Sequence, residues 1–154
     1  MALTSAGILL FRRSPELEVF IAHMGGPFWA RKDDGAWSIP KGLYDATEEP
    51  LVAALREFAE EIGTTAPTAN YELLGEFRLS SSKSLTVFAA ETDFTVESVN
   101  SNEFELEWPP RSGRMQLFPE IDDARWFSVA DARVKLATGQ VPLLDALEAL
   151  VASS

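Results

Sequence analysis

The chain has 154 residues, no cysteine and a formal net charge of −11. This length suits one domain with a hydrophobic core, which we expect to span residues 1–154. The missing cysteine excludes disulfides, thiolate chemistry and cysteine-based zinc sites. The negative charge argues against a surface for duplex nucleic acid, which needs a basic stripe. A polyphosphate can still bind an acidic protein when cations bridge the two.

The N-terminal segment MALTSAGILLFRR, residues 1–13, combines an apolar run with two arginines. In a secretory signal the basic residues precede the apolar run and a small-residue cleavage site follows it, and this segment has neither feature. No apolar run in the chain approaches the roughly 18 residues of a membrane span. We therefore expect a cytoplasmic protein without a membrane partner, and we interpret GILLFR, residues 7–12, as the first strand.

The other elements are predicted from apolar periodicity, from β-branched and aromatic runs and from turn residues. In chain order they are a turn at 13–16, a strand at 17–24, a loop at 25–37, a short strand at 37–40, a helix at 47–62, paired strands at 71–80 and 84–94, an irregular segment at 100–122, a strand at 124–129 and helices at 129–137 and 141–152. Long irregular segments are usually functional or disordered. This order predicts a mixed α/β domain with helices packed on a sheet.

The helix at 47–62 has two contrasting faces. Its apolar residues recur at helical spacing: Leu51, Leu55, Phe58 and Ile62. Its carboxylates Glu57, Glu60 and Glu61 share another face, because three- and four-residue steps are neighbours on a helix. The two faces lie about 140° apart. We expect the first to be buried and the second to present three carboxylates.

Residues at both ends of this helix favour its boundaries. Thr47 is expected to cap the start, and Glu48 and Glu49 are expected in the first turn, where the helix dipole favours acids. Pro50 is tolerated early in a helix. Gly63 is expected to end it.

The acidic face has two interpretations. Most charged helix faces are simply solvated. Like charges at this spacing, however, destabilise a helix by a few tenths of a kcal/mol each, and Arg56 is the sole cation in residues 42–64. A divalent cation would explain the arrangement, because Mg²⁺ and Mn²⁺ prefer oxygen ligands and are often shared with substrate phosphates.

Residues 42–64, GLYDATEEPLVAALREFAEEIGT, resemble the Nudix box, G-x5-E-x7-R-E-U-x-E-E-x-G-U, in which U is a bulky apolar residue. The matching positions are Gly42, Glu48, Arg56, Glu57, Phe58, Glu60, Glu61 and Gly63. Thr64 departs from the pattern, because an aliphatic residue is usual there, and Phe58 is larger than the common residues. Neither departure is at a metal ligand. The flanking segments SAGILLFRR and WSIPKG also resemble the family.

The resemblance implies the Nudix fold, in which a mixed β-sheet lies between helices (α/β/α). It also implies hydrolysis of a nucleoside diphosphate linked to a further group X, with Mg²⁺ or Mn²⁺ as cofactor. Nudix dimers are common, so the resemblance allows a homodimer. The number of metal ions stays open.

The resemblance also assigns roles to residues of the box. Glu57, Glu60 and Glu61 would be the metal ligands, and a backbone carbonyl near Lys41 or Gly42 would complete a site. Glu57 is in addition a candidate for the base that activates water. The pair of Glu48 and Arg56 would hold the loop against the helix.

Four cations are weaker candidates for phosphate contacts. Lys41 lies beside the box, Arg31 and Lys32 lie in the preceding loop, and Lys83 lies in the turn between the paired strands. Each also has the simpler interpretation of a surface charge.

Aromatic and acidic residues outside the box are further candidates. Trp29 and Phe28 could stack on a base, whereas we favour a core position for Trp37. His23 is the only histidine, and a hydrogen-bonded structural role is favoured over a catalytic one. An additional ligand or base could come from the long irregular segment, which contains Glu103, Glu105 and Glu107.

The leading hypothesis is a Nudix hydrolase that cleaves a phosphoanhydride bond by attack of water. GILLFRR, WSIPKG and KSLTVF most resemble the diadenosine-polyphosphate branch, so a dinucleoside polyphosphate is the first substrate candidate. The alternatives are clean-up of (d)NTPs, hydrolysis of ADP-ribose, and hydrolysis of RNA 5′ ends, which the net charge disfavours for long RNA. A non-catalytic nucleotide sensor and an acidic interaction domain are the non-enzymatic alternatives.

Overall fold

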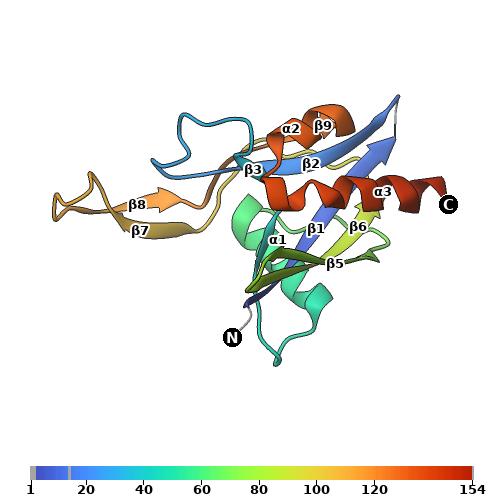
Figure 1. Ribbon diagram of the computed structural model, residues 1–154, viewed down its shortest axis with the longest axis horizontal. Helices are drawn as coiled ribbons and strands as arrows, with labels where there is room; N and C mark the ends of the chain where they lie inside the picture. Colours follow the sequence, from blue (N-terminus) through green and yellow to red (C-terminus); the bar gives the residue numbers. More distant parts are fainter. Residues whose placement is uncertain (1–2, 14, 154) are drawn as a thin grey trace.

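The computed structural model describes residues 3–13 and 15–153. Within this part of the chain, seven strands form one mixed sheet (Figure 1). They are β1 (Leu3–Arg13), β2 (Leu17–Met24), β3 (Trp37–Ser38), β4 (Lys41–Leu43), β5 (Glu72–Ser80), β6 (Lys83–Glu91) and β9 (Ile121–Ser128). The order is β3-β2-β1-β6-β5, with β4 paired to β1 and β9 paired to β2.

Strand β1 occupies the middle of the sheet. It is parallel to β6 and antiparallel to β2 and β4. Its side chains alternate between two cores: Leu9 and Phe11 belong to one, and Ile8 and Leu10 belong to the other. Because both faces of β1 are covered, its sequence is an almost continuous apolar run rather than an alternating one.

Helices cover the two faces of the sheet. Helix α1 (Pro50–Ile62) packs Phe58 and Ile62 into the core that contains Ile8 and Leu10. Helices α2 (Val129–Lys135) and α3 (Pro142–Ala152), with the 3-10 turn η1 (Thr138–Gln140), contribute to the opposite core. In Figure 1, α3 runs across β1 and β6. The predicted α/β/α arrangement is therefore confirmed.

The predicted start of the first helix was wrong. The helix begins at Pro50, and Glu49 before it is extended, with φ −71° and ψ 144°. A proline disfavours helical geometry in the preceding residue, so Glu48 and Glu49 lie before the first turn rather than in it. Thr47 does not cap the helix: its amide and Oγ1 donate to Asp45 Oδ1 at 2.9 and 2.5 Å. The predicted end at Gly63 is confirmed.

The segment 100–122 was expected to be irregular, yet much of it forms a hairpin. Strands β7 (Glu103–Glu107) and β8 (Met115–Pro119) pair antiparallel and project from the body of the molecule at the left of Figure 1. The sequence EFELE alternates polar and apolar residues with the strand period, but the proline- and glycine-rich turn that follows obscured this signal. We call residues 103–119 the arm.

The remaining predicted strands and helices are confirmed with shifted ends, and the segment 37–40 divides into β3 and the approach to β4. The predicted turn at 13–16 includes Ser14, which lies outside the described residues. Among the described residues, every helix is too short or too polar to cross a membrane.

Candidate active site

The C-terminal end of α1 fixes a distant segment of the chain. Gly63 ends the helix in the left-handed conformation, with φ 86°. The amides of Asn100 and Asn102 then donate to the last carbonyls of the helix, on Ile62 and Glu60, at 3.0 and 2.9 Å. A Cβ atom on Gly63 would lie 2.4 Å from the Asn100 carbonyl oxygen. The glycine therefore permits the close approach of the two segments.

These contacts position Glu120, which lies between β8 and β9. Its amide donates to the Asn102 carbonyl at 2.9 Å, and its carbonyl accepts from the Gly25 amide at 2.8 Å. A Cβ atom on Gly25 would lie 2.1 Å from the Pro119 carbonyl oxygen, so the start of the β2–β3 loop lies directly against this turn. The backbone of Glu120 is therefore held from two sides.

Glu120 and Glu61 line one pocket of about 290 Å³. Its walls come from β2, the β2–β3 loop, β3, β4, α1 and the arm, and its lining residues are Met24, Gly25, Trp29, Ser38, Lys41, Glu61, Phe104, Glu120 and Ile121. The pocket thus combines two carboxylates, one ammonium group and two aromatic rings. This mixture suits a ligand that carries both phosphate and an aromatic base.

Glu61 is the most perturbed acid of the pocket. Its Oε1 atom accepts the backbone amide of Lys41 at 3.0 Å. Burial raises the pKa of Glu61 to about 8, and the negative charges of Glu120 and Glu57 act in the same direction. Positive charge from Lys41 opposes the shift without cancelling it. A cation bound here would favour the ionised form.

Glu57 lies one helical turn away, against β4. Its side chain is 13% exposed, and burial raises its pKa although Arg56 opposes this. A Cβ atom on Gly42 would lie 2.0 Å from the Glu57 carboxyl carbon. Gly42 pairs with Ala6 of β1, so the sheet sets this distance. Any side chain at position 42 would therefore clash with the Glu57 carboxylate, so this position of β4 requires a glycine.

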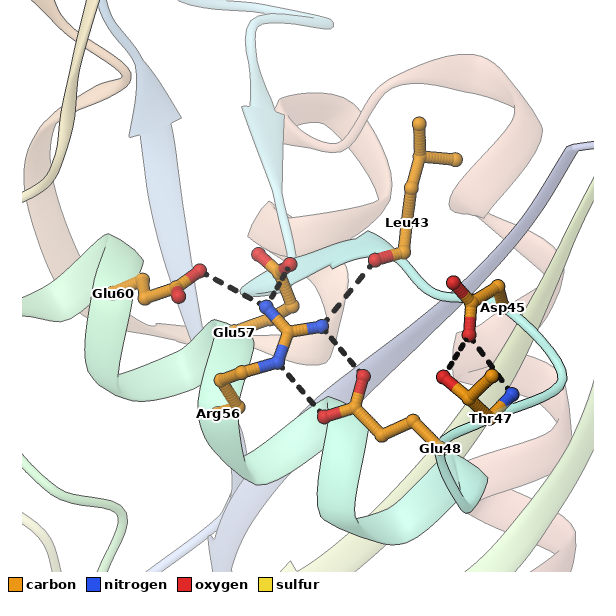
Figure 2. A network of polar contacts seen from close by, with 7 residues as sticks. All are labelled: Leu43, Asp45, Thr47, Glu48, Arg56, Glu57 and Glu60. Atoms are coloured by element: carbon orange, nitrogen blue, oxygen red, sulfur yellow. Dashed lines mark hydrogen bonds and ion pairs between the residues drawn. The ribbon is translucent and has the colours of Figure 1, made fainter.

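Arg56 connects the carboxylates of the box (Figure 2). Its Nε and Nη2 atoms donate to the two carboxyl oxygens of Glu48 at 2.8 and 2.9 Å, which is the predicted pair. Its Nη1 atom donates to Glu57 Oε1 at 2.8 Å and to Glu60 Oε2 at 3.2 Å. The hydrogen bonds from Arg56 to Glu48 hold the pKa of Glu48 below its ordinary value. The loop before α1 is thereby fastened to the helix by a bidentate ion pair.

The donors around the pocket suit Mg²⁺ or Mn²⁺ in chemistry. Glu57, Glu61 and Glu120 provide the hard oxygen ligands that these ions prefer, and the electrostatic coupling among them raises the pKa of Glu57 and of Glu61. In the described residues, no three Asp, Glu or His side chains converge closely enough to hold an ion without moving. In this structure Arg56 Nη1 bridges Glu57 and Glu60, and the single guanidinium charge is shared among these two carboxylates and Glu48.

Of the lysines predicted to contact phosphate, Lys41 alone is part of the pocket lining. Lys41 lines the pocket, together with Trp29. Lys32 is not part of the pocket lining, and its Nζ atom lies 3.6 Å from the centre of the Phe28 ring and 5.3 Å from that of Trp29. Lys83 lies elsewhere, at the start of β6 opposite Leu3.

His23 and Trp37 have structural positions. Trp37 is 4% exposed and belongs to the core, as expected. His23 is buried, with Nδ1 2.7 Å from Asp122 Oδ1 and Nε2 2.6 Å from the carbonyl oxygen of Lys32. It therefore fastens the β2–β3 loop to β9, in agreement with the favoured interpretation.

The three acids of the irregular segment that were candidates for an additional ligand or base do not line the pocket. Glu103, Glu105 and Glu107 are exposed on the arm, and Glu107 accepts the Gly113 amide at 2.9 Å. The acid that lines the pocket is Glu120. It stands alone between two short strands, and its sequence neighbours carry no motif or periodicity that would single it out. Phe104 was missed because the hairpin that carries it was not predicted.

Comparison with known proteins identifies the family of this chain. A family model described as "NUDIX domain" matches residues 1–147. The chain belongs to the Nudix family. An RNA pyrophosphohydrolase of Acidiphilium cryptum is 41% identical over 73 residues, which cover 47% of this Nudix chain and 40% of that protein. One from Rhodospirillum rubrum is 50% identical over 54 residues, or 34% of this chain and 30% of that protein. The match thus spans less than half of these relatives.

Solved structures support the Nudix fold. A C. elegans Ap4A hydrolase binary complex superposes with a TM-score of 0.66 and 22% identity, covering 99% of this chain and 100% of that one. The NUDIX domain of Shewanella oneidensis NrtR, complexed with ADP ribose, gives a TM-score of 0.65 and 18% identity, covering 98% and 89%. At these identities the likeness concerns the fold alone.

Proposed function

We propose that this Nudix chain hydrolyses a phosphoanhydride bond in a nucleoside diphosphate linked to a further group X, with Mg²⁺ or Mn²⁺ as cofactor. The observation that carries the proposal is the buried carboxyl of Glu61, which faces Glu120 across the pocket and is coupled to Glu57. Buried like charges are costly unless a cation compensates them. A divalent ion held here and shared with substrate phosphates would supply that compensation and would lower the pKa of a bound water.

The residues of the chain would divide the remaining work. Glu57 and Glu61 offer oxygen ligands from α1, and Glu120 offers a third from the β8–β9 turn. The Lys41 ammonium lines the same pocket and would contact the phosphate. Trp29 offers a ring for a base, since stacking of a base on an aromatic side chain is worth about 1–3 kcal/mol. Glu60, on the open side of α1, would stay paired with Arg56 or join a further site.

In the proposed reaction, the oxygen of water forms a bond to phosphorus while the bond from that phosphorus to the bridging oxygen breaks. The bridging oxygen leaves with the other phosphate and carries the electron pair. A proton of the attacking water passes to a carboxylate and then to solvent. Glu57 is our first candidate for this base, because burial raises its pKa and therefore its affinity for a proton. Glu120 is the alternative.

The substrate candidates rest on different supports. A dinucleoside polyphosphate is favoured by the sequence resemblance and agrees with the Ap4A hydrolase found among structures of the same fold. The 5′ end of an RNA agrees with the names of the curated relatives. The net charge of −11 disfavours extensive contacts to a long RNA. We place the dinucleoside polyphosphate first, ahead of short 5′-triphosphorylated RNA, (d)NTPs and ADP-ribose.

Product analysis tests the proposal. Purified protein would be incubated with Mg²⁺ or Mn²⁺ and diadenosine tetraphosphate, 5′-triphosphorylated RNA, dNTPs or ADP-ribose in ¹⁸O-labelled water. We expect turnover of at least one substrate, label in one phosphate product, and a loss of orders of magnitude in rate for Glu61→Gln. Glu105→Gln, on the exposed side of the arm, is the matched control and should retain full activity. No turnover of any substrate with either metal would overturn the proposal.

A non-catalytic nucleotide sensor is the second candidate. The observation that favours it is the position of Arg56, which donates hydrogen bonds to both Glu57 and Glu60 and so competes with a metal ion for them. A sensor would show saturable nucleotide binding without product in the same experiment. The complete set of box carboxylates favours the hydrolase over this candidate.

A further inference from the structure

The arm has two chemically different faces. In an antiparallel pair, directly opposite residues point to the same face, so the register of β7 and β8 assigns each side chain to one of them. The outer face carries Glu103, Glu105, Glu107, Met115 and Leu117. The inner face carries Phe104, Leu106, Gln116 and Phe118. The pairing continues one step further, because the Trp108 amide donates to the Arg114 carbonyl at 2.9 Å. Trp108 and Arg114 therefore extend the inner face.

The inner face begins inside the catalytic pocket. Phe104 lines that pocket together with Glu61 and Glu120. Its ring packs against the β2–β3 loop, where a Cβ atom on Gly26 would lie 2.8 Å from Phe104 Cζ. From Phe104 the strand leads to Trp108, a distance of about 14 Å at the usual strand rise of about 3.4 Å per residue. The inner face is thus a continuous strip from the carboxylates to the end of the arm.

Charge distinguishes the two faces for a phosphate-bearing ligand. In the described part of the arm, the carboxylates all lie on the outer face, where their side chains are exposed. The inner face presents apolar, aromatic and amide side chains and ends at the backbone pair of Trp108 and Arg114. An anionic chain is therefore repelled by one face and accepted by the other. Alternating aromatic and cationic groups are also the usual platform for unpaired bases.

The turn of the arm is ordered by its own hydrogen bonds. Gly113 donates its amide to Glu107 Oε2 at 2.9 Å, and Gln116 Nε2 donates to the Trp108 carbonyl at 2.6 Å. The Arg114 amide donates to Ser112 Oγ at 3.1 Å. Trp108 and Arg114 are therefore held in place at the far end of the strip. A two-stranded hairpin gains little stability from its own packing, so the ordered turn suits a binding role.

We propose that the inner face of the arm binds the second nucleoside of the substrate, the X group beyond the phosphates, by stacking its base on Trp108 beside Arg114. This inference rests on the proposed function, and it names the part of the substrate that the catalytic pocket leaves open. The separation of about 14 Å between Phe104 in the pocket and Trp108 suits a base joined to a pocket-bound phosphate by further phosphates or by one more nucleotide. This chemistry is shared by dinucleoside polyphosphates and short 5′-triphosphorylated RNA, whereas a nucleoside triphosphate lacks the second base.

Steady-state kinetics of Trp108→Ala and Met115→Ala test this inference. Both residues are in the arm, but Met115 is exposed on the outer face. The substrates are diadenosine tetraphosphate, a 5′-triphosphorylated dinucleotide RNA and ATP. We expect Trp108→Ala to raise KM roughly 10-fold or more for the substrates with a second base, with KM for ATP unchanged. Met115→Ala should behave as wild type, and Trp108→Phe should restore much of the affinity.

The comparison of the first two substrates identifies the source of the second base. An effect confined to diadenosine tetraphosphate assigns the strip to a polyphosphate-linked nucleoside, and an effect confined to the RNA assigns it to the second nucleotide of a strand. Equal KM values of wild type and Trp108→Ala for both substrates would overturn the inference. An equal rise in KM of Trp108→Ala for ATP would overturn it too, because the effect would then not depend on the presence of a second base.

A binding measurement separates this inference from the proposed function. Fluorescently labelled diadenosine tetraphosphate and labelled dinucleotide RNA would be titrated with wild-type protein and with Trp108→Ala, and anisotropy would report Kd. If hydrolysis is absent but Trp108→Ala still weakens binding roughly 10-fold, the proposed function fails and the binding strip stands. If hydrolysis occurs and both proteins bind equally, the strip fails and the proposed function stands. Circular dichroism of each variant confirms that the fold is intact.

Discussion

Gly42 and Glu57 approach so closely that a methyl group on the glycine would lie 2.0 Å from the carboxyl carbon of the glutamate. The contact joins strand β4 to helix α1 at the point where the proposed metal ligand leaves the helix. Both partners are fixed, because Gly42 is paired to β1 and α1 is anchored by Phe58 in the core. The position of the Glu57 carboxylate is therefore a direct consequence of the absent side chain on Gly42.

Replacement of Gly42 by alanine should displace Glu57. A misplacement of about 1 Å at a reacting group can cost about 100-fold in rate, so we expect a loss of that order in kcat for Gly42→Ala. Gly139→Ala is the control, because its new methyl group would meet Leu79 at an ordinary 3.4 Å. Kinetics of both variants, with thermal unfolding as a check of folding, make the comparison. Wild-type activity of Gly42→Ala would show that Glu57 is not positioned by this contact.

The metal-free protein should lose stability as the pH rises. The pKa of Glu61 is about 8 in the folded state against an ordinary 4.5, so the folded protein binds the proton more tightly than the unfolded chain. The contribution of Glu61 to the free energy of unfolding is therefore complete below pH 4.5 and is lost as the pH rises to about 8. The slope in this window is at most about 1.4 kcal/mol per pH unit.

Urea unfolding in EDTA between pH 5 and 9 measures this dependence. Glu61→Gln should flatten it, because the amide does not titrate. Mg²⁺ should restore stability to the wild type at pH 8 and do little for the variant, since an ion that binds only the folded state stabilises it. A wild-type stability that is flat or rising with pH in EDTA would contradict the assigned role of Glu61.

Glu120 should matter for catalysis more than any carboxylate of the arm. We expect Glu120→Gln to reduce metal affinity or rate about 10- to 100-fold, as is usual for groups in or next to a metal shell. Glu103→Gln and Glu105→Gln should be near wild type, because their side chains are exposed on β7. Mn²⁺ titration and kcat/KM for all three variants test the expectation. A larger loss of metal affinity or kcat/KM in either arm variant than in Glu120→Gln would contradict this expectation.

The pair of Arg56 and Glu48 should couple the loop to the helix. Arg56 donates two hydrogen bonds to Glu48 at 2.8 and 2.9 Å, but its side chain is 37% exposed. We therefore expect only a small favourable coupling energy from a double-mutant cycle of Arg56→Gln and Glu48→Gln. Unfolding in urea gives the four free energies. Strictly additive effects would mean that the bidentate pair contributes nothing to stability.

Local pattern by itself determined much of this protein. The apolar positions of α1, the end of that helix at Gly63 and the strand at residues 7–12 follow from apolar patterning and from backbone preferences of neighbouring residues. The spacing of the box residues likewise indicated the family and the proposed metal ligands on α1. In each case the decisive interactions join residues close together in the chain, so a linear pattern can carry them.

Only the tertiary structure decided the other half of the site. Glu120 reaches Glu61 because the end of α1 holds Asn102 and Asn102 holds the β8–β9 turn, a series of backbone hydrogen bonds between distant segments. The inner face of the arm is defined by the register of β7 with β8 and by the packing of Phe104 against Gly26. Nearly every residue carries the same backbone donor and acceptor. The local sequence therefore does not indicate which distant segments these groups will join by hydrogen bonds.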